Sequence, residues 1–136
     1  MTRRINFEGV NCIIFEQNLF SDNMPLVKIG STQVTTRQAK IHIDNIIDLI
    51  STLIEAGAIV DERLEKYSTA LSVLHAVKAV FNRGNPKPPT VDMAKTAIDV
   101  VKEIALIEIT DELPRAGIKS AAFVAKLMID KGGLDG

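Results

Sequence analysis

The spacing of isoleucines between residues 40 and 56 constrains the fold of this chain more than any other feature. Branched aliphatic residues recur there at intervals of three and four: Ile43, Ile46, Ile47 and Ile50. This is the repeat of one buried face of an α-helix. Thr35 or Thr36 can cap the start of this helix, and Gly57 can end it in the left-handed conformation. The spacing therefore predicts a helix from about residue 40 to residue 56.

A second helix is predicted to begin at Asp61, as its N-cap, and to run to about Arg83. Its expected buried face consists of Leu64, Tyr67, Leu71, Leu74, Val77 and Phe81. The short connection to the preceding helix implies an antiparallel hairpin. Gly84 ends the second helix, and the proline-rich residues 85–89 form a stiff connector.

Two more helices are predicted in the C-terminal part of the chain. Thr90 can cap the third, whose inner face has Ala and Ile at helical spacing. Residues 104–109 are apolar nearly all round, and we favour a helix over a strand because the three-four repeat enters them without interruption. Pro114 breaks the chain, and a fourth helix is expected over residues 116–130.

The first 36 residues show a different repeat. Ile5 and Phe7 alternate with polar neighbours, and Val10, Cys12 and Ile14 continue this period of two, which indicates strands. Gly30-Ser31 suits a tight hairpin turn. The predicted fold is α+β and mainly α: a short N-terminal antiparallel β-meander packed on a bundle of about four helices. We expect a single domain over residues 1–136, with a β-rich part (1–36) and a helical part (37–136).

The composition narrows the classes of function. The net charge is −1, without a strongly basic or acidic segment, and aromatic residues make up 4%. The chain therefore has little of the basic charge that attracts nucleic acid and few aromatic side chains on which bases can stack. Cys12 is the only cysteine, which fits a reducing compartment. No apolar run has the length of a signal peptide or a membrane span, so we expect a cytoplasmic protein.

Catalytic and metal-binding patterns are weak. Ser72 and His75 are three residues apart on the second helix, but no orienting acid or strand–helix turn accompanies them. His42 and His75 lack the spacing of a metal-binding pair. We therefore expect no enzymatic activity, no cofactor and no metal site.

The outer face of the first helix carries an acidic stripe made of Asp44, Asp48 and Glu55. In the simplest interpretation it is a solvated face on which Lys40 and Asp44 form an i,i+4 pair. Carboxylates of this kind can also hold Mg²⁺, and the stripe can also meet a basic partner protein.

Residues 109–134 resemble the sequence pattern of a helix-turn-helix followed by a wing. In this alternative the chain is a DNA-binding regulator, and its candidate contact residues are Arg115, Lys119, Ser120 and Lys126. Nearby acidic residues offset these cations, and affinity for DNA depends on a cationic surplus.

Small residues on the fourth helix, among them Ala121 and Ala125, let another helix approach closely, either within the chain or from another subunit. By exclusion, we expect a non-enzymatic protein–protein interaction or assembly module that self-associates as a homo-oligomer, for example in a phage or bacterial structural complex. The candidate partner-binding residues are Asp44, Asp48, Glu55, Ala121 and Ala125. A toxin-neutralising immunity protein is a further alternative.

Overall fold

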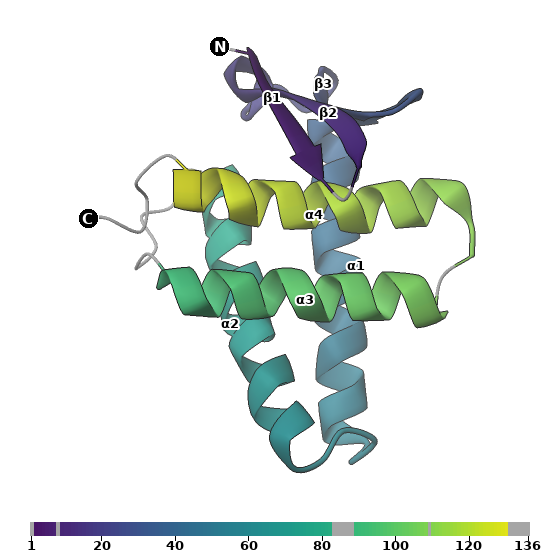
Figure 1. Ribbon diagram of the computed structural model, residues 1–136, viewed down its shortest axis with the longest axis vertical. Helices are drawn as coiled ribbons and strands as arrows, with labels where there is room; N and C mark the ends of the chain where they lie inside the picture. The colour runs from purple at the N-terminus through teal and green to yellow at the C-terminus, as the bar shows by residue number, and fades with distance from the viewer. Residues whose placement is uncertain (1, 8, 83–88, 109, 131–136) are drawn as a thin grey trace.

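The computed structural model shows four strands followed by four long helices (Figure 1) and describes residues 2–7, 9–82, 89–108 and 110–130. The strands are β1 (Thr2–Phe7), β2 (Val10–Phe15), β3 (Pro25–Ile29) and β4 (Thr32–Thr35), and a short 3-10 helix, η1 (Glu16–Asn18), follows β2. The helices are α1 (Thr36–Glu55), α2 (Glu62–Phe81), α3 (Val91–Glu108) and α4 (Glu112–Asp130). The predicted α+β class, mainly α, is confirmed.

The sheet is an antiparallel meander with the strand order β1-β2-β3-β4. Its inner face is formed by buried apolar residues: Ile5, Cys12, Ile14, Val27, Ile29 and Val34. A register shift between Pro25 and Val27 turns both Leu26 and Val27 inward, so β3 departs from strict alternation. Gly30 has a φ of +59°, which allows the tight turn from β3 to β4. The predicted hairpin at Gly30-Ser31 is therefore confirmed.

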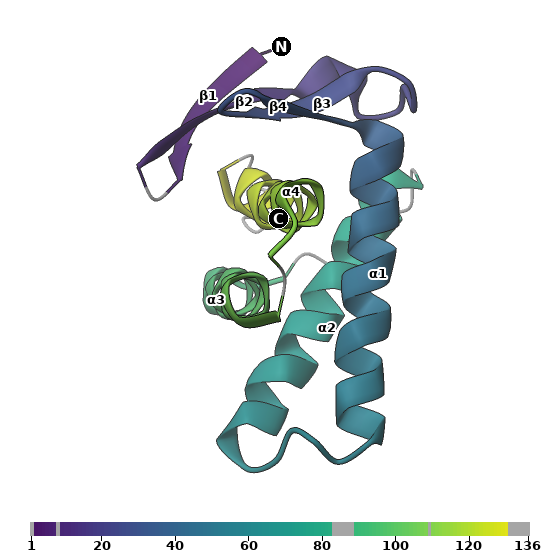
Figure 2. The ribbon, with the colours of Figure 1, turned by 90° about the vertical axis from the view of Figure 1, so that its right-hand side faces the viewer.

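The helices form two hairpins that run across each other. Helices α1 and α2 lie side by side, and α3 and α4 cross them (Figures 1 and 2). Figure 2 shows α4 as a middle layer, with the sheet on one side of it and α3 on the other. None of the described helices is both long and apolar enough to cross a membrane.

A capping box and one further hydrogen bond fix the start of α1 next to the sheet. The Thr35 side chain accepts from the Gln38 backbone N–H at 3.2 Å, and the Gln38 side chain accepts from the Thr35 N–H at 2.9 Å, which completes a capping box. The buried Thr36 hydroxyl donates to the Asn18 carbonyl oxygen at 2.7 Å. These bonds fix the direction in which α1 leaves the sheet, and they confirm the predicted cap.

Three details of the predicted helices are wrong. Asp61 precedes α2 but makes no side-chain cap bond, since its backbone lies at a φ of +58°. Leu64 was expected on the buried face, yet 40% of its surface is exposed, because this end of the α1–α2 hairpin extends beyond α3 (Figure 2). Helix α4 begins at Glu112 and includes Pro114 in its first turn, where proline costs no backbone hydrogen bond.

The third helix agrees with its prediction. The Met93 backbone N–H donates to the Thr90 hydroxyl at 3.2 Å, and α3 remains helical to Glu108, which settles the choice between helix and strand over residues 104–108. Ile109, Gly84, residues 85–88 of the predicted connector and the glycines at 132 and 133 lie outside the described residues.

The small residues of α4 allow close packing inside the chain. Ala121 and Ala125 are buried, as are their alanine neighbours on the same helix. Gly117 lies directly against the imidazole ring of His42 on α1, and a Cβ at this position would overlap the ring. Close approach of α4 to its neighbours was predicted from these residues, and the structure shows that the neighbours belong to the same chain.

Candidate functional site

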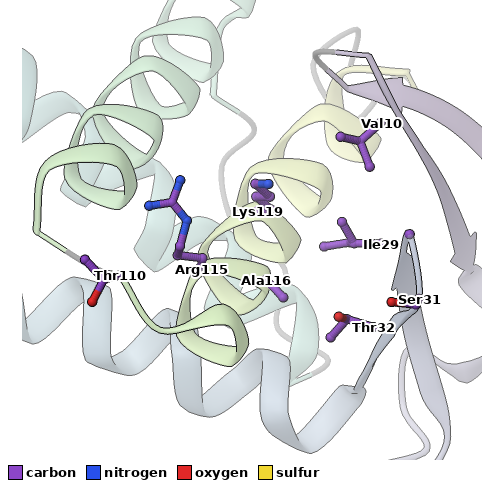
Figure 3. Close-up of a pocket in the computed structure, with 9 residues that line it drawn as sticks. Val10, Ile29, Ser31, Thr32, Thr110, Arg115, Ala116 and Lys119 are labelled. Atoms are coloured by element: carbon purple, nitrogen blue, oxygen red, sulfur yellow. The ribbon is translucent and has the colours of Figure 1, made fainter.

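A cavity of about 420 Å³ lies between the β3–β4 turn and the first half of α4 (Figure 3). Its described lining residues come from four segments of the chain: Val10, Ile29, Gly30, Ser31, Thr32, Thr110, Arg115, Ala116 and Lys119. The size falls within the range of about 300–1,000 Å³ that is usual for binding pockets. We call this cavity the basic cleft.

The rim of the basic cleft is cationic and rich in hydroxyl groups. Arg115 and Lys119 are four residues apart on α4 and therefore share one face of the helix. Ser31 and Thr32 lie on the opposite side of the cleft, and Thr110 lies just before α4 (Figure 3). The described lining residues include no carboxylate, so this rim attracts anions.

The two cations differ in how they are held. The Arg115 guanidinium donates a hydrogen bond of 3.0 Å to the carbonyl oxygen of Ala105 on α3, which fixes its position. Lys119 makes no hydrogen bond or ion pair with any residue that the structure describes. The Lys119 ammonium is thus available to a ligand, while Arg115 is oriented in advance.

The floor of the basic cleft is apolar. Ile29 and Ala116 are buried, and Val10 is partly buried. Cys12 lies nearby on β2: burial raises the pKa of its thiol, and the charges of Lys119 and Lys126 lower this pKa by less. The thiol is therefore a neutral part of the core, and the cleft combines an apolar floor with a cationic rim.

A second hollow, of about 350 Å³, adjoins the strands β1 to β3 and shares Gly30 with the basic cleft. Its described lining includes Arg4 and Lys28, together with Asn6 and Asn11. Positive charge therefore continues from the basic cleft past the β3–β4 turn.

The acidic residues predicted on α1 differ in their partners. The Asp44 carboxylate pairs with Lys78 of α2 at 2.7 Å, and the Lys40 ammonium pairs with Asp22 at 2.7 Å. The expected pair of Lys40 with Asp44 is therefore wrong: each of the two residues pairs with another segment instead. Asp48 and Glu55 are exposed.

The other candidate residues for partner contacts lie inside the molecule. Ala121 and Ala125 have exposed fractions of 1% and 3%. They pack against this chain's own elements, because α4 is the layer between the sheet and α3. A partner reaches them only if that layer opens.

The candidate DNA contacts do not all reach the surface of the molecule. Arg115 and Lys119 line the basic cleft, and Lys126 is partly buried further along α4. Ser120 is fully buried, and its hydroxyl donates to the Ala116 carbonyl oxygen at 3.0 Å. A recognition helix presents consecutive side chains to the major groove. Because the sheet covers α4, this arrangement gives the helix-turn-helix alternative no support.

Catalytic and metal-binding groups do not gather in the part of the chain that the structure describes. His42 packs against Gly117, whereas His75 is exposed on α2. The Ser72 hydroxyl donates to the Ser68 carbonyl oxygen at 3.3 Å. Among the described residues, no three or more His, Cys, Asp and Glu side chains are close enough to hold a metal ion.

The sequence analysis missed the hydroxyl side of the basic cleft. Ser31 was interpreted as a turn residue only, and Thr32 and Thr110 were given no role. The available signal was the hydroxyl pair that follows Gly30, but a turn of this kind is common and does not indicate a ligand. Only the fold brings Ser31 and Thr32 opposite Arg115 and Lys119, with Thr110 on the same side as Arg115.

Comparisons of the chain with protein-family models, with curated proteins and with solved structures gave no match. Its function is therefore argued from the geometry and the charges of the cleft. The cationic rim over an apolar floor is the feature of the described residues on which a functional proposal can be based.

Proposed function

We propose that the chain is a non-enzymatic protein-interaction module that holds an acidic segment of its partner in the basic cleft. One observation carries this proposal: Arg115, bonded to Ala105, and Lys119, which pairs with no described residue, line one side of a cleft that has an apolar floor and has Ser31 and Thr32 on its other side. Arginine binds carboxylates through two parallel hydrogen bonds, lysine adds a point charge, and hydroxyl groups donate further bonds.

The apolar floor favours a peptide over a small inorganic anion. Ile29, Ala116 and Val10 offer a surface for an aliphatic side chain, while the rim takes the neighbouring carboxylate. An apolar centre with a polar rim is the usual arrangement of a protein interface. The partner segment is therefore expected to combine acidic and aliphatic residues.

The test is an NMR titration of the ¹⁵N-labelled chain with a hexaglutamate peptide at low ionic strength, with hexaglutamine as the uncharged control. We expect hexaglutamate to shift the amide signals of residues 30–32 and 115–119 and hexaglutamine to leave them in place. Lys119→Glu is expected to weaken binding about tenfold or more, because it puts a like charge on the rim.

The matched control for this titration is Lys95→Glu, an equal charge change at an exposed lysine of α3 away from the cleft. It should bind hexaglutamate nearly as well as the parent chain. The proposal fails if the shifts lie elsewhere or if both variants weaken binding equally. A shift produced by duplex DNA but not by hexaglutamate would favour the DNA-binding alternative.

A further inference from the structure

The connection between α1 and α2 exposes two large apolar side chains. Val60 has an exposed fraction of 56% and Leu64 one of 40%. A single exposed aliphatic residue is ordinary on a protein surface. Here the two are four residues apart, at the end of the molecule where the α1–α2 hairpin extends beyond α3 (Figure 2). Leu64 follows the spacing of the buried face of α2, yet the described part of the chain covers it only partly.

Three carboxylates are close to these two residues in the sequence. Asp61, Glu62 and Glu65 are exposed, and none forms an ion pair or a side-chain hydrogen bond with a described residue. We call Val60, Leu64 and these three residues the acidic tip.

The cations near the acidic tip offset little of its charge. The Arg63 guanidinium pairs with Glu103 of α3 at 3.0 Å and lies 5.3 Å from the centre of the Tyr67 ring. It is thereby drawn towards α3. Lys66, the remaining cation of this stretch, faces three carboxylates. The tip keeps a negative charge around an apolar centre.

The acidic tip and the basic cleft are complementary in two respects. The tip has aliphatic residues next to carboxylates, and the cleft has an aliphatic floor beside Arg115 and Lys119. They also lie at different ends of the molecule, because the α1–α2 connection is remote from the sheet and α4 in both views (Figures 1 and 2). One copy of the chain can therefore use both surfaces at once.

We infer that the acidic segment bound in the basic cleft is the acidic tip of a second copy of this chain. This inference rests on the proposed function and names its partner. Leu64 and Val60 cover the floor of the cleft, and the carboxylates of the tip meet Arg115 and Lys119. Because the two surfaces differ, the contact is head-to-tail, and it builds closed rings or open filaments rather than a symmetric dimer.

The test uses two variants that each disable one surface. Lys119→Glu disables the cleft, and Leu64→Lys combined with Glu65→Lys disables the tip. All three substituted side chains are at least partly exposed, so circular dichroism should show native helix content. If either protein loses that signal, Lys119→Gln or Leu64→Gln takes its place.

Sedimentation velocity at low salt is the measurement. The parent chain is expected to form species larger than a dimer as its concentration rises, and salt should weaken them. Each variant alone should be a monomer. Their equimolar mixture should form a dimer and grow no further, because the intact tip of one variant fills the intact cleft of the other.

The control variants lie on α3: Lys95→Glu repeats the charge change of Lys119→Glu, and Asp99→Lys repeats that of Glu65→Lys. Both should assemble like the parent chain. The inference is overturned if the parent chain stays monomeric, if either disabling variant assembles normally, or if the mixture forms no dimer. A monomeric parent chain that still binds hexaglutamate in the cleft would overturn the inference and leave the proposed function standing. If the parent chain neither assembles nor binds hexaglutamate in the cleft, both the inference and the proposed function are rejected.

Discussion

At Gly117 the absence of a side chain sets how closely α4 approaches α1. The His42 ring occupies the space that a Cβ would need. Gly117→Ala should therefore destabilise the fold by about 1–3 kcal/mol through overpacking, despite the better helix propensity of alanine. Urea unfolding measures this loss. The double variant with His42→Ala and Gly117→Ala removes the overlap and should recover part of the lost stability. If its loss of stability equals the sum of the losses in the two single variants, the explanation is contradicted.

The pKa of His42 gives the stability of the fold a pH dependence. Burial lowers this pKa below its ordinary value of 6.5, because the charged imidazolium is poorly solvated there. Between the lowered pKa and 6.5 the unfolded chain binds more protons, so the free energy of unfolding falls as the pH drops through this window. Above 6.5 the contribution is fully present.

The prediction is checked by measuring the urea concentration at the midpoint of unfolding at pH values on both sides of this pH window. His42→Gln should flatten the pH dependence across it. His75→Gln, at the exposed histidine of α2, is the matched control and should keep the dependence of the parent chain. An unchanged profile in His42→Gln would show that another group is responsible.

Among the elements, α1 and α2 begin in contrasting ways. A capping box at Thr35 starts α1, whereas Asp61 precedes α2 in a backbone conformation that favours glycine and gives no cap bond in return. Asp61→Gly should relieve this strain and stabilise the fold by about 1 kcal/mol. The measurement is thermal unfolding, with Asp61→Asn as the control that removes the charge and keeps the side chain. A loss of stability in Asp61→Gly would show that the carboxylate has a stabilising role.

The helices could be predicted because their apolar repeats are local. The repeat of α1 and the cap at Thr90 depend only on neighbours in the sequence, and both are confirmed. Leu64 was misplaced because a repeat does not show where the neighbouring helix ends. Pro114 was taken as a break because the sequence does not show whether a proline falls in the first turn of a helix or in its interior.

The basic cleft could be predicted only in part. Arg115 and Lys119 were named from the sequence only as candidate contacts of the DNA-binding alternative, and Arg115 was placed before the predicted fourth helix. Whether such a pair faces solvent, a groove of DNA or a hydroxyl-lined cavity depends on what packs over the helix. That layer is the sheet, which comes from the other end of the chain. Its placement over α4 is a long-range property that no local pattern contains.

At the scale of the whole molecule, α4 is the middle layer of one buried apolar core to which the sheet, α1, α2 and α3 also contribute. The sheet packs on one side of it, and α3 packs on the other (Figure 2). A small sheet of this kind is not stable alone, and removing it would expose the buried face of α4. We therefore expect the described elements to unfold as one cooperative unit.

The only cysteine and the only tyrosine of the chain report on the two sides of this arrangement. Cys12 is buried between the sheet and α4, and Tyr67 is buried beside α3. Reaction of a thiol reagent with Cys12 requires exposure of a thiolate, and burial raises the pKa of this thiol.

Labelling of Cys12 in urea should follow the same midpoint as tyrosine fluorescence and helical circular dichroism. Cys12→Ala controls for labelling at other groups. If Cys12 reacts at urea concentrations where the Tyr67 signal is still native, the sheet separates from the helices before they unfold, and the cleft it shares with α4 opens with it.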